Sequence, residues 1–321
     1  MKKELKNTLI FIVAGVILYA ILKILISNEI INDYFATIIM VICINIILAV
    51  SLNLIIGLTG QLTLGHAGFM SIGAYTAAML TLKMNMPFPI VLLIGGIFAG
   101  AFGFLIGLPT LRLKGDYLAI TTLGFGEIIR VVITNIESLG GGRGLSGIPP
   151  KTTFTWVFFI MLFTIVIIIN IARSSQGRAM KSVREDEIAA EAMGINTTKY
   201  KIMSFVIGSF FAGVAGGLFA HAMYFIKPDQ FGFLKSVDIV TYVVLGGMGS
   251  LSGSILSTAT LISLPEALRS LNEYRMILYP IALIIIMRFR PQGLLGSDEV
   301  SLEMFNKFIK GSGKNVIAKG K

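Results

Sequence analysis

The sequence has little charge, one cysteine and two histidines. Only 14% of its 321 residues are Asp, Glu, Lys or Arg, which is about half the share of an ordinary soluble domain. The single cysteine, Cys43, excludes an intrachain disulfide and zinc sites that need two cysteines. With only His66 and His221 available, a histidine-based metal site is also disfavoured. We therefore expect the chain itself to bind no metal and no cofactor.

Long apolar stretches take the place of the missing charge. Hydrophobic residues make up 55% of the chain, and a stretch of roughly 20 such residues is enough to cross a bilayer. The expected fold is an all-α polytopic membrane protein with about 8–10 transmembrane segments, one or more of them broken or re-entrant. The apolar segments are 9–26, 35–56, 65–82, 90–108, 117–133, 154–171, 202–224, 239–264 and 276–287.

The basic residues cluster beside these segments. Four stretches hold 18 of the 27 Lys and Arg residues: 2–6, 112–114, 172–201 and 288–321. Cytoplasmic loops carry such an excess of positive charge, so we expect these stretches, and with them both termini, in the cytoplasm and the loop 27–34 outside. This distribution also accounts for the net charge of +10 without a nucleic acid partner. The first apolar segment is expected to be a retained helix rather than a signal peptide.

Glycine-rich breaks interrupt two of the segments. Two ends on one side require an even number of crossings, so one of the nine segments does not cross simply. The candidate is 239–264, because the Gly- and Ser-rich run 246–253 favours a broken or re-entrant helix and places 265–275 outside. A second break at 57–68 lies in the other half of the chain, which suggests an internal repeat. Such paired breaks point to a transport pathway, with close helix packing as the alternative.

The basic stretch 172–201 contains a short amphipathic helix at about 184–196. Either Glu185 or Asp186 is expected to cap its start, and Gly194 to end it. Apolar residues recur at Ile188, Ala192 and Ile195, which gives one narrow apolar face. Such a helix suits docking into a groove on a cytosolic partner, and a connector lying on lipid headgroups is the alternative.

This helix resembles the coupling helix of ABC importer permeases, whose motif is Glu-Ala-Ala, three variable residues and Gly. Ala189, Ala190 and Gly194 match the motif, whereas Ile188 stands at the Glu position and Glu187 comes one residue earlier. Over about 35–296 the chain resembles the LivM-type permease subunits of branched-chain amino acid importers. The other motifs that carry this resemblance are NL at 53–54, GLTGQLTLGHAGFM at 57–70, GDYLAITTLGFGEIIR at 115–130, GLSGIP at 144–149 and RPQGL at 290–294.

The resemblance implies a bacterial inner-membrane complex. Its expected partners are a second permease of the LivH type, two cytosolic ATPases that carry ATP and Mg, an extracytoplasmic amino-acid binding protein, and the bilayer. The chain contains no complete phosphate-loop motif, since Gly311–Lys314 lacks the upstream spacing. We expect an N-terminal region at 1–34, a permease domain at 35–296 and a flexible basic tail at 297–321. The expected ATPase-coupling residues are Glu185, Asp186, Glu187, Ala189, Ala190, Glu191 and Gly194.

Glu127 and Arg130 are the charges placed most deeply in an apolar segment. Glu127 lies ten residues into its segment, about 15 Å along a helix, and the spacing of three puts both side chains on one face. A zwitterionic amino acid needs one anionic and one cationic contact, so the pair is a pathway candidate, with a structural ion pair as the alternative. The further pathway candidates are Gly60, Gln61, His66, Thr121, Thr122, Gly246 and Gly247.

Three other functions compete with the amino-acid importer. A urea-type ABC permease has similar motifs, and an ion-coupled secondary transporter would use Glu127 as its coupling carboxylate. A serine protease within the membrane is disfavoured, because Ser146 of the sequence GLSG lies in an expected external loop without a suitable base. The chain is thus expected to be a transporter subunit rather than an enzyme.

Overall fold

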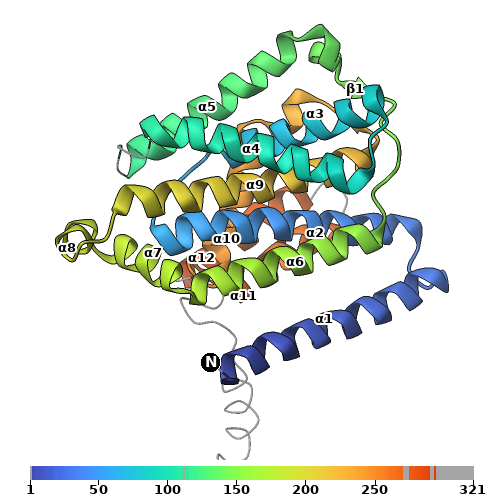
Figure 1. Cartoon of the computed structure of the whole chain (residues 1–321). Helices are drawn as coiled ribbons and strands as arrows, with labels where there is room; N and C mark the ends of the chain where they lie inside the picture. Colours follow the sequence, from blue (N-terminus) through green and yellow to red (C-terminus); the bar gives the residue numbers. More distant parts are fainter. Residues whose placement is uncertain (1, 111–112, 114, 270–274, 290–292, 294–321) are drawn as a thin grey trace, which may run out of the picture.

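The computed structural model describes residues 2–110, 113, 115–269, 275–289 and 293. They form an all-α bundle of long helices that lie side by side (Figure 1). Two short helices, α7 and α8, project from one end of the bundle, and a pair of two-residue strands lies at the other (Figure 1). We refer to these as the α8 end and the strand end.

The first half of the described chain supplies the helices up to α5. The elements are α1 (Lys2–Ser27), α2 (Asp33–Asn53), the π-helix η1 (Leu54–Leu58), α3 (His66–Met84), α4 (Phe88–Thr110), α5 (Asp116–Asn135), η2 (Glu137–Leu139), η3 (Gly141–Arg143) and β1 (Leu145–Ser146).

The second half adds the projecting helices and a helical hairpin. Strand β2 pairs with β1 in antiparallel fashion, with Leu145 opposite Ile226. The elements are α6 (Phe154–Arg173), α7 (Ser175–Glu185), α8 (Glu187–Ala192), α9 (Thr197–Met223), β2 (Phe225–Ile226), η4 (Pro228–Phe231), α10 (Phe233–Gly246), α11 (Leu251–Ala267) and α12 (Arg275–Phe289).

The helices agree closely with the apolar segments expected from the sequence. Five helical stretches in the described part of the chain are long and apolar enough to cross a membrane: Asp33–Leu58, α4, α5, α6 and α9. The basic stretch 172–201, expected to be a loop with one short helix, contains a second helix, α7. The expected tail 297–321, the motif at 290–294, and the basic residues Arg112 and Lys114 lie outside the described residues.

Small residues allow the central helices to approach closely. A Cβ atom built on Gly73 of α3 would lie only 2.1 Å from the carbonyl oxygen of Gly213 in α9. A Cβ on Gly216 would lie 2.0 Å from the carbonyl oxygen of Met70. Helices in lipid associate through such small-residue contacts, because lipid supplies little hydrophobic drive for them to pack. The glycine surplus therefore brings α3, α4 and α9 into backbone contact.

The expected broken segment 239–264 consists of two helices that run in opposite directions. Helix α10 ends at Gly246, the chain turns through Gly247 and Gly249, and α11 begins at Leu251. Both turn glycines have positive φ, +110° and +99°, which side-chain-bearing residues rarely adopt. The expected interruption is confirmed, but as a hairpin of two helices and not as a single re-entrant segment.

The hairpin returns the chain to the strand end. Near the end of α11, Glu266 accepts a hydrogen bond of 2.8 Å from the hydroxyl of Tyr34, which opens α2. The segments 27–34 and 265–269, both expected outside, thus lie at the same end of the bundle. Because one of the nine apolar segments forms two helices, the number of segments becomes even, as two chain ends on the same side require.

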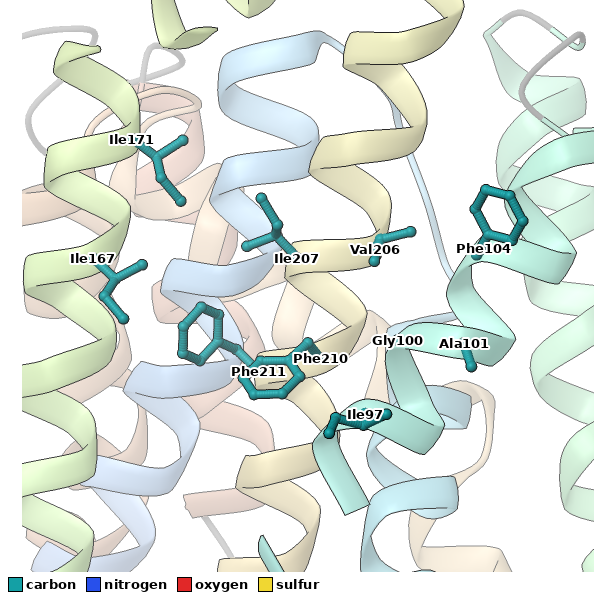
Figure 2. A pocket seen from close by; sticks show the side chains of 10 residues that line it. All are labelled: Ile97, Gly100, Ala101, Phe104, Ile167, Ile171, Val206, Ile207, Phe210 and Phe211. Carbon is teal, nitrogen blue, oxygen red and sulfur yellow. The ribbon is translucent and has the colours of Figure 1, made fainter. Parts of the chain in front are cut away.

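An apolar groove runs between α4, α6 and α9 (Figure 2). Its volume is about 630 Å³, and none of its ten lining residues has a polar side chain. Phe104, Ile167 and Phe210 represent the three helices in the groove (Figure 2). Such a surface suits contact with lipid or another apolar helix and offers nothing to recognise a polar solute.

Candidate functional site

The two glycine-rich breaks meet inside the bundle. The side-chain oxygen of Asn53 accepts a 2.9 Å hydrogen bond from the amide of Gly249. Its side-chain nitrogen donates to the carbonyl oxygen of Ser250 at 2.8 Å and to Oγ of Ser254 at 2.7 Å. A Cβ on Gly57 would lie 2.6 Å from the Gly249 nitrogen. Segments some 196 residues apart are thus joined at one place, which we call the glycine junction (Asn53, Gly57, Gly249).

Close packing explains two of the pathway candidates. A Cβ on Gly246 would lie 2.5 Å from the carbonyl carbon of Gly253, so the backbones of α10 and α11 touch there. Gly247 is buried in the same turn. Neither residue faces open space in the described structure. Both glycines thus pack closely in the turn, and their role in a pathway stays a prediction.

Arg184 connects α7 to the glycine junction. Its Nη1 donates a 2.5 Å hydrogen bond to the carbonyl oxygen of Gly57. The side chain also passes close to Gly60, where a Cβ would lie 3.1 Å from Cγ of Arg184. Nothing in the sequence distinguishes Arg184 as a site residue, because it is one of several basic residues in the stretch 172–201. Through it, the projecting helices contact the first break directly.

The helix expected at about 184–196 is shorter in the structure: α8 spans Glu187–Ala192, residues 184–185 end α7, and residues 193–196 lie outside any helix. Helix α7 ends at Glu185, and Asp186 then caps α8 by accepting hydrogen bonds from the amides of Ile188 at 2.9 Å and Ala189 at 3.0 Å. Gly194, with φ of +82°, follows the end of α8 in a conformation that favours glycine. Of the two capping candidates, Asp186 is thus the one that caps α8.

Side chains fix α8 to the start of α9. Glu187 Oε1 lies 2.5 Å from Nζ of Lys201, and Glu191 Oε1 accepts a 2.6 Å hydrogen bond from the hydroxyl of Thr197. On the outer side, Ile188 is 76% exposed, as is Met193 at 82%. Ala190 is buried against the bundle. The helix therefore presents an apolar tip while polar contacts hold its base.

The predicted pair of Glu127 and Arg130 forms on α5. Arg130 Nε lies 2.7 Å from Glu127 Oε2, and Arg130 Nη1 lies 2.9 Å from Oδ1 of Asp229 in η4. The second oxygen of Glu127 accepts a 3.0 Å hydrogen bond from the amide of Phe233, the first residue of α10. A carboxylate at a helix N-terminus is stabilised by the exposed amides and the helix dipole. The pair thus also ties α5 to η4 and α10.

This ion-pair network stays partly open. The side chains of Glu127 and Arg130 are 33% and 30% exposed, and that of Asp229 is 79% exposed. Helix α5 has the lowest mean hydropathy of the five candidate spans, and only 28% of its apolar window is buried, against 72% for Asp33–Leu58. The structure therefore places charged groups on an uncovered face of a membrane helix.

The two pathway threonines on α5 lie in different environments. Thr121 is half-buried and its hydroxyl bonds only to the carbonyl of Tyr117 in its own helix. Thr122 is buried, and its Oγ1 accepts a 3.1 Å hydrogen bond from the amide of Leu64. Thr121 lies nine residues before Arg130, about half a turn away around α5, so it faces away from the ion-pair network. Thr122 holds the chain that precedes α3.

Both histidines lie in the protein interior. His66 begins α3, is fully buried, and its Nε2 lies 3.0 Å from Oγ of Ser51, while its Nδ1 has no partner among the described residues. His221 lies 2.9 Å from Oγ1 of Thr81 and 2.9 Å from the carbonyl oxygen of Gly217. These contacts suit packing residues. No group of three His, Cys, Asp or Glu residues suited to a metal occurs in the part of the chain that the structure describes.

Two charged residues near α10, Lys235 and Asp229, have contacts that the sequence pattern does not predict. Nζ of Lys235 donates a 2.7 Å hydrogen bond to the side-chain oxygen of Asn45, midway along α2. The expected span began only at residue 239, so Lys235 and Asp229 fell within an apparent loop. A lysine and an aspartate that closely precede an apolar segment were the available signal, but nothing in the sequence gave their depth.

Comparison with known proteins gives a consistent match. Residues 34–287 match the family model described as branched-chain amino acid transport system, permease component. The chain is 38% identical to the high-affinity branched-chain amino acid transport system permease protein LivM of Escherichia coli, covering 75% of this chain and 65% of the relative. It is 25% identical to the probable branched-chain amino acid transport permease protein LivM of Methanocaldococcus jannaschii, covering 70% and 74%.

A second kind of permease also matches. The LivH permease of Escherichia coli is 34% identical over 46% of this chain and 49% of its own length. The match to the Escherichia coli LivM protein covers 65% of that protein, so the chain spans slightly less than two thirds of its length. No solved structure matches the chain.

Proposed function

The chain belongs to the family of branched-chain amino acid transport system permease components, and on this premise we propose that it forms part of the translocation path of an importer for hydrophobic amino acids. Leucine, isoleucine and valine are the proposed substrates. The relatives whose names state a function are transport permeases, and the proposal treats the chain as a transporter subunit without catalytic chemistry of its own.

The observation that carries the proposal is the charged, uncovered face of α5. Ionisable groups exposed to hydrocarbon are costly, so they face other protein or water within a membrane protein. Glu127 and Arg130 offer one negative and one positive group on this face, and a zwitterionic amino acid needs a partner for each of its two charges. Helix α5 is therefore proposed to line the path with the face that carries these two charges.

A second permease subunit would complete the path. The names of the relatives describe both LivM and LivH permeases of branched-chain amino acid transport, and we propose a LivH-type partner opposite the α5 face. Such a partner would cover the ion-pair network on its open side. It would also explain why so little of α5 is buried within this chain.

The energy would come from two cytosolic ATPases that hold ATP and Mg. They are proposed to dock on α8, whose apolar tip of Ile188 and Met193 projects from the bundle. A binding protein would deliver substrate at the strand end. Movement of α8 would be transmitted to the glycine junction through Arg184 of α7. It would also be transmitted to α6, which precedes α7, and to α9, which follows α8.

Substitution of the α5 charges tests the path. Glu127→Gln and Arg130→Gln are each expected to lower the initial rate of leucine uptake by about tenfold, because each removes one charge that the zwitterion contacts. Uptake of labelled leucine by cells or vesicles, normalised to membrane abundance, measures this effect. Glu137→Gln, on an exposed residue in η2 beyond α5, is the matched control. Normal uptake at normal abundance in both variants would reject the path role.

An ion-coupled mechanism is the main rival. It would need no docking helix for an ATPase, whereas α8 projects an apolar tip of Ile188 and Met193. We therefore expect leucine uptake to survive a protonophore as long as ATP is maintained, and an ATPase to copurify with the chain. Collapse of uptake with the proton gradient at constant ATP would favour the rival, and competition by urea would indicate a urea-type permease.

A further inference from the structure

A small polar cavity lies at the α8 end, where α7 joins α8. Its volume is about 200 Å³, which equals the space of about seven water molecules at ~30 Å³ each. Four separate parts of the chain line it: the reversal at 59–61, residues before and in the first turns of α5, the junction of α7 and α8, and the first turns of α9. Leu118, the α5 residue that lines the cavity, lies nine residues before Glu127, about 14 Å along the helix.

One wall of the cavity contains a buried amide without a partner. Gln61 is only 4% exposed, and neither its Nε2 nor its Oε1 has a hydrogen-bond partner among the described residues. Buried polar groups in native proteins are almost always paired, so an exception calls for a missing partner. An amide offers a donor and an acceptor together. The occupant of this cavity should therefore be able to accept and to donate.

The charged groups of the cavity have both signs. The side chain of Lys201 is only 10% exposed and lies 2.5 Å from Glu187 Oε1, and both residues line the cavity. Arg184, Glu185 and Asp186 add one positive and two negative groups to the wall. A simple anion would meet three carboxylates, and a simple cation would meet two basic groups. A zwitterion satisfies both signs at once.

The rest of the wall is apolar. Leu113, Leu118 and Val183 line the cavity opposite the charged groups, and such carbon surface favours an apolar side chain on the ligand. We propose that this cavity binds a zwitterionic α-amino acid with a short branched side chain, its carboxylate toward Lys201, its ammonium toward Glu187, and the Gln61 amide bonded to either. This inference rests on the proposed function, since it makes the transported amino acid also the ligand of a second site beside α8.

Equilibrium binding of labelled leucine tests the site. The complete transporter in nanodiscs, without ATP and without the binding protein, is titrated with leucine. Lys201→Met and Gln61→Leu are each expected to weaken binding by about tenfold or more. Their matched controls are Lys199→Met, two residues before Lys201 on the exposed side of α9, and Gln176→Leu on the exposed side of α7, and both should bind as wild type. Gln61→Leu leaves the ion pair of Lys201 intact, so it separates loss of the site from loss of stability.

Two leucine analogues test the need for both charges. Isoamylamine lacks the carboxylate and 4-methylvalerate lacks the ammonium, so each should displace labelled leucine about tenfold more weakly than leucine itself. Equal displacement by either analogue would overturn the zwitterion assignment. Equal leucine binding in the cavity variants and their controls would overturn the site. Binding that is lost in Arg130→Gln but kept in Lys201→Met would place leucine on α5 and also overturn it.

ATP-driven leucine uptake by the wild-type complex in proteoliposomes separates this inference from the proposed function. Uptake together with cavity-independent binding would overturn only the second site. Binding that depends on Gln61 and Lys201 without any ATP-driven uptake would support the site as an amino-acid site and reject the importer.

Discussion

The side chain of Asn53 has all of its hydrogen-bonding groups occupied by the turn between α10 and α11. Its oxygen accepts from Gly249, and its nitrogen donates to Ser250 and Ser254, while the residue itself is 1% exposed. A membrane core offers no water to replace such partners. The free backbone groups of a tight turn are thereby satisfied at the depth where the chain reverses.

Loss of this side chain should therefore destabilise the fold. Asn53→Ala removes three hydrogen bonds, and at ~0.6–1 kcal/mol each we expect unfolding free energy to fall by about 2–3 kcal/mol. Asn135→Ala removes one bond to its own helix on an exposed face and should cost little. Thermal unfolding of the purified protein, followed by circular dichroism, compares the two. Equal melting temperatures in these variants would contradict the role assigned to the glycine junction.

At the same scale, the sequence predicted side chains that meet within one helix. The spacing of Glu127 and Arg130 was enough to predict their pairing, because helix geometry places residues three apart on one face. Their further partners, Asp229 and the Phe233 amide, depend on where α10 begins in space. No local pattern records that position, so the capping role of Glu127 was not predictable.

Among the elements, α8 shows how a very short helix is held in place. Its six residues are too few for a stable isolated helix. The Asp186 cap, the Glu187–Lys201 ion pair and the Glu191–Thr197 hydrogen bond fix it to the chain on either side. A force applied to its apolar tip would then be passed to α9 rather than lost in bending.

Reversal of charge at the base of α8 should uncouple the transporter. Glu187→Lys places a second ammonium group beside Lys201, and Glu191→Lys removes the acceptor of Thr197. We expect leucine transported per ATP hydrolysed to fall by about fivefold or more in the double variant. Reconstituted vesicles give both rates. Partial recovery when Lys201→Glu is added to Glu187→Lys would support the ion pair as the cause, and unchanged coupling in the double variant would reject it.

The elements themselves were largely predictable from apolar length. Spans such as α4 and α6 are continuous apolar runs, so hydropathy alone gave their bounds to within a few residues. In the sequence, the hairpin of α10 and α11 has the pattern of a single segment, because two short apolar helices with a glycine turn between them look like one interrupted apolar run. Helix α7 is polar and short. It lies in the basic stretch 172–201, whose positive charge predicts a cytoplasmic loop, so its amphipathic pattern did not stand out.

For the whole molecule, the position of α5 is the main asymmetry. It lies at one edge of the bundle and α1 at the other (Figure 1). The groove of α4, α6 and α9 is apolar throughout (Figure 2), while the face of α5 carries charge. The molecule thus has one apolar surface and one charged surface, and neither could be assigned to a side of the bundle before its helices were placed.

Cysteine labelling can distinguish these surfaces. In a Cys43→Ser background, Leu123→Cys, four residues before Glu127 on the same face of α5, should react with a water-soluble maleimide at least about fivefold faster than Phe163→Cys, which is exposed on α6, because the thiolate needs water to form. The measurement uses the assembled complex in membranes. Equal, slow labelling at both positions would show that water does not reach the α5 face.

The glycine junction also limits how early the protein can complete its fold during synthesis. Asn53 and its partner Gly249 are separated by 196 residues of chain, which a ribosome adding ~5–20 residues per second needs about 10–40 s to supply. For that interval, α2 is already made while the groups that its asparagine will bind do not yet exist. The first half of the protein must therefore wait in the membrane with its reversal unfinished, which makes this interval the time when an insertase or chaperone matters most.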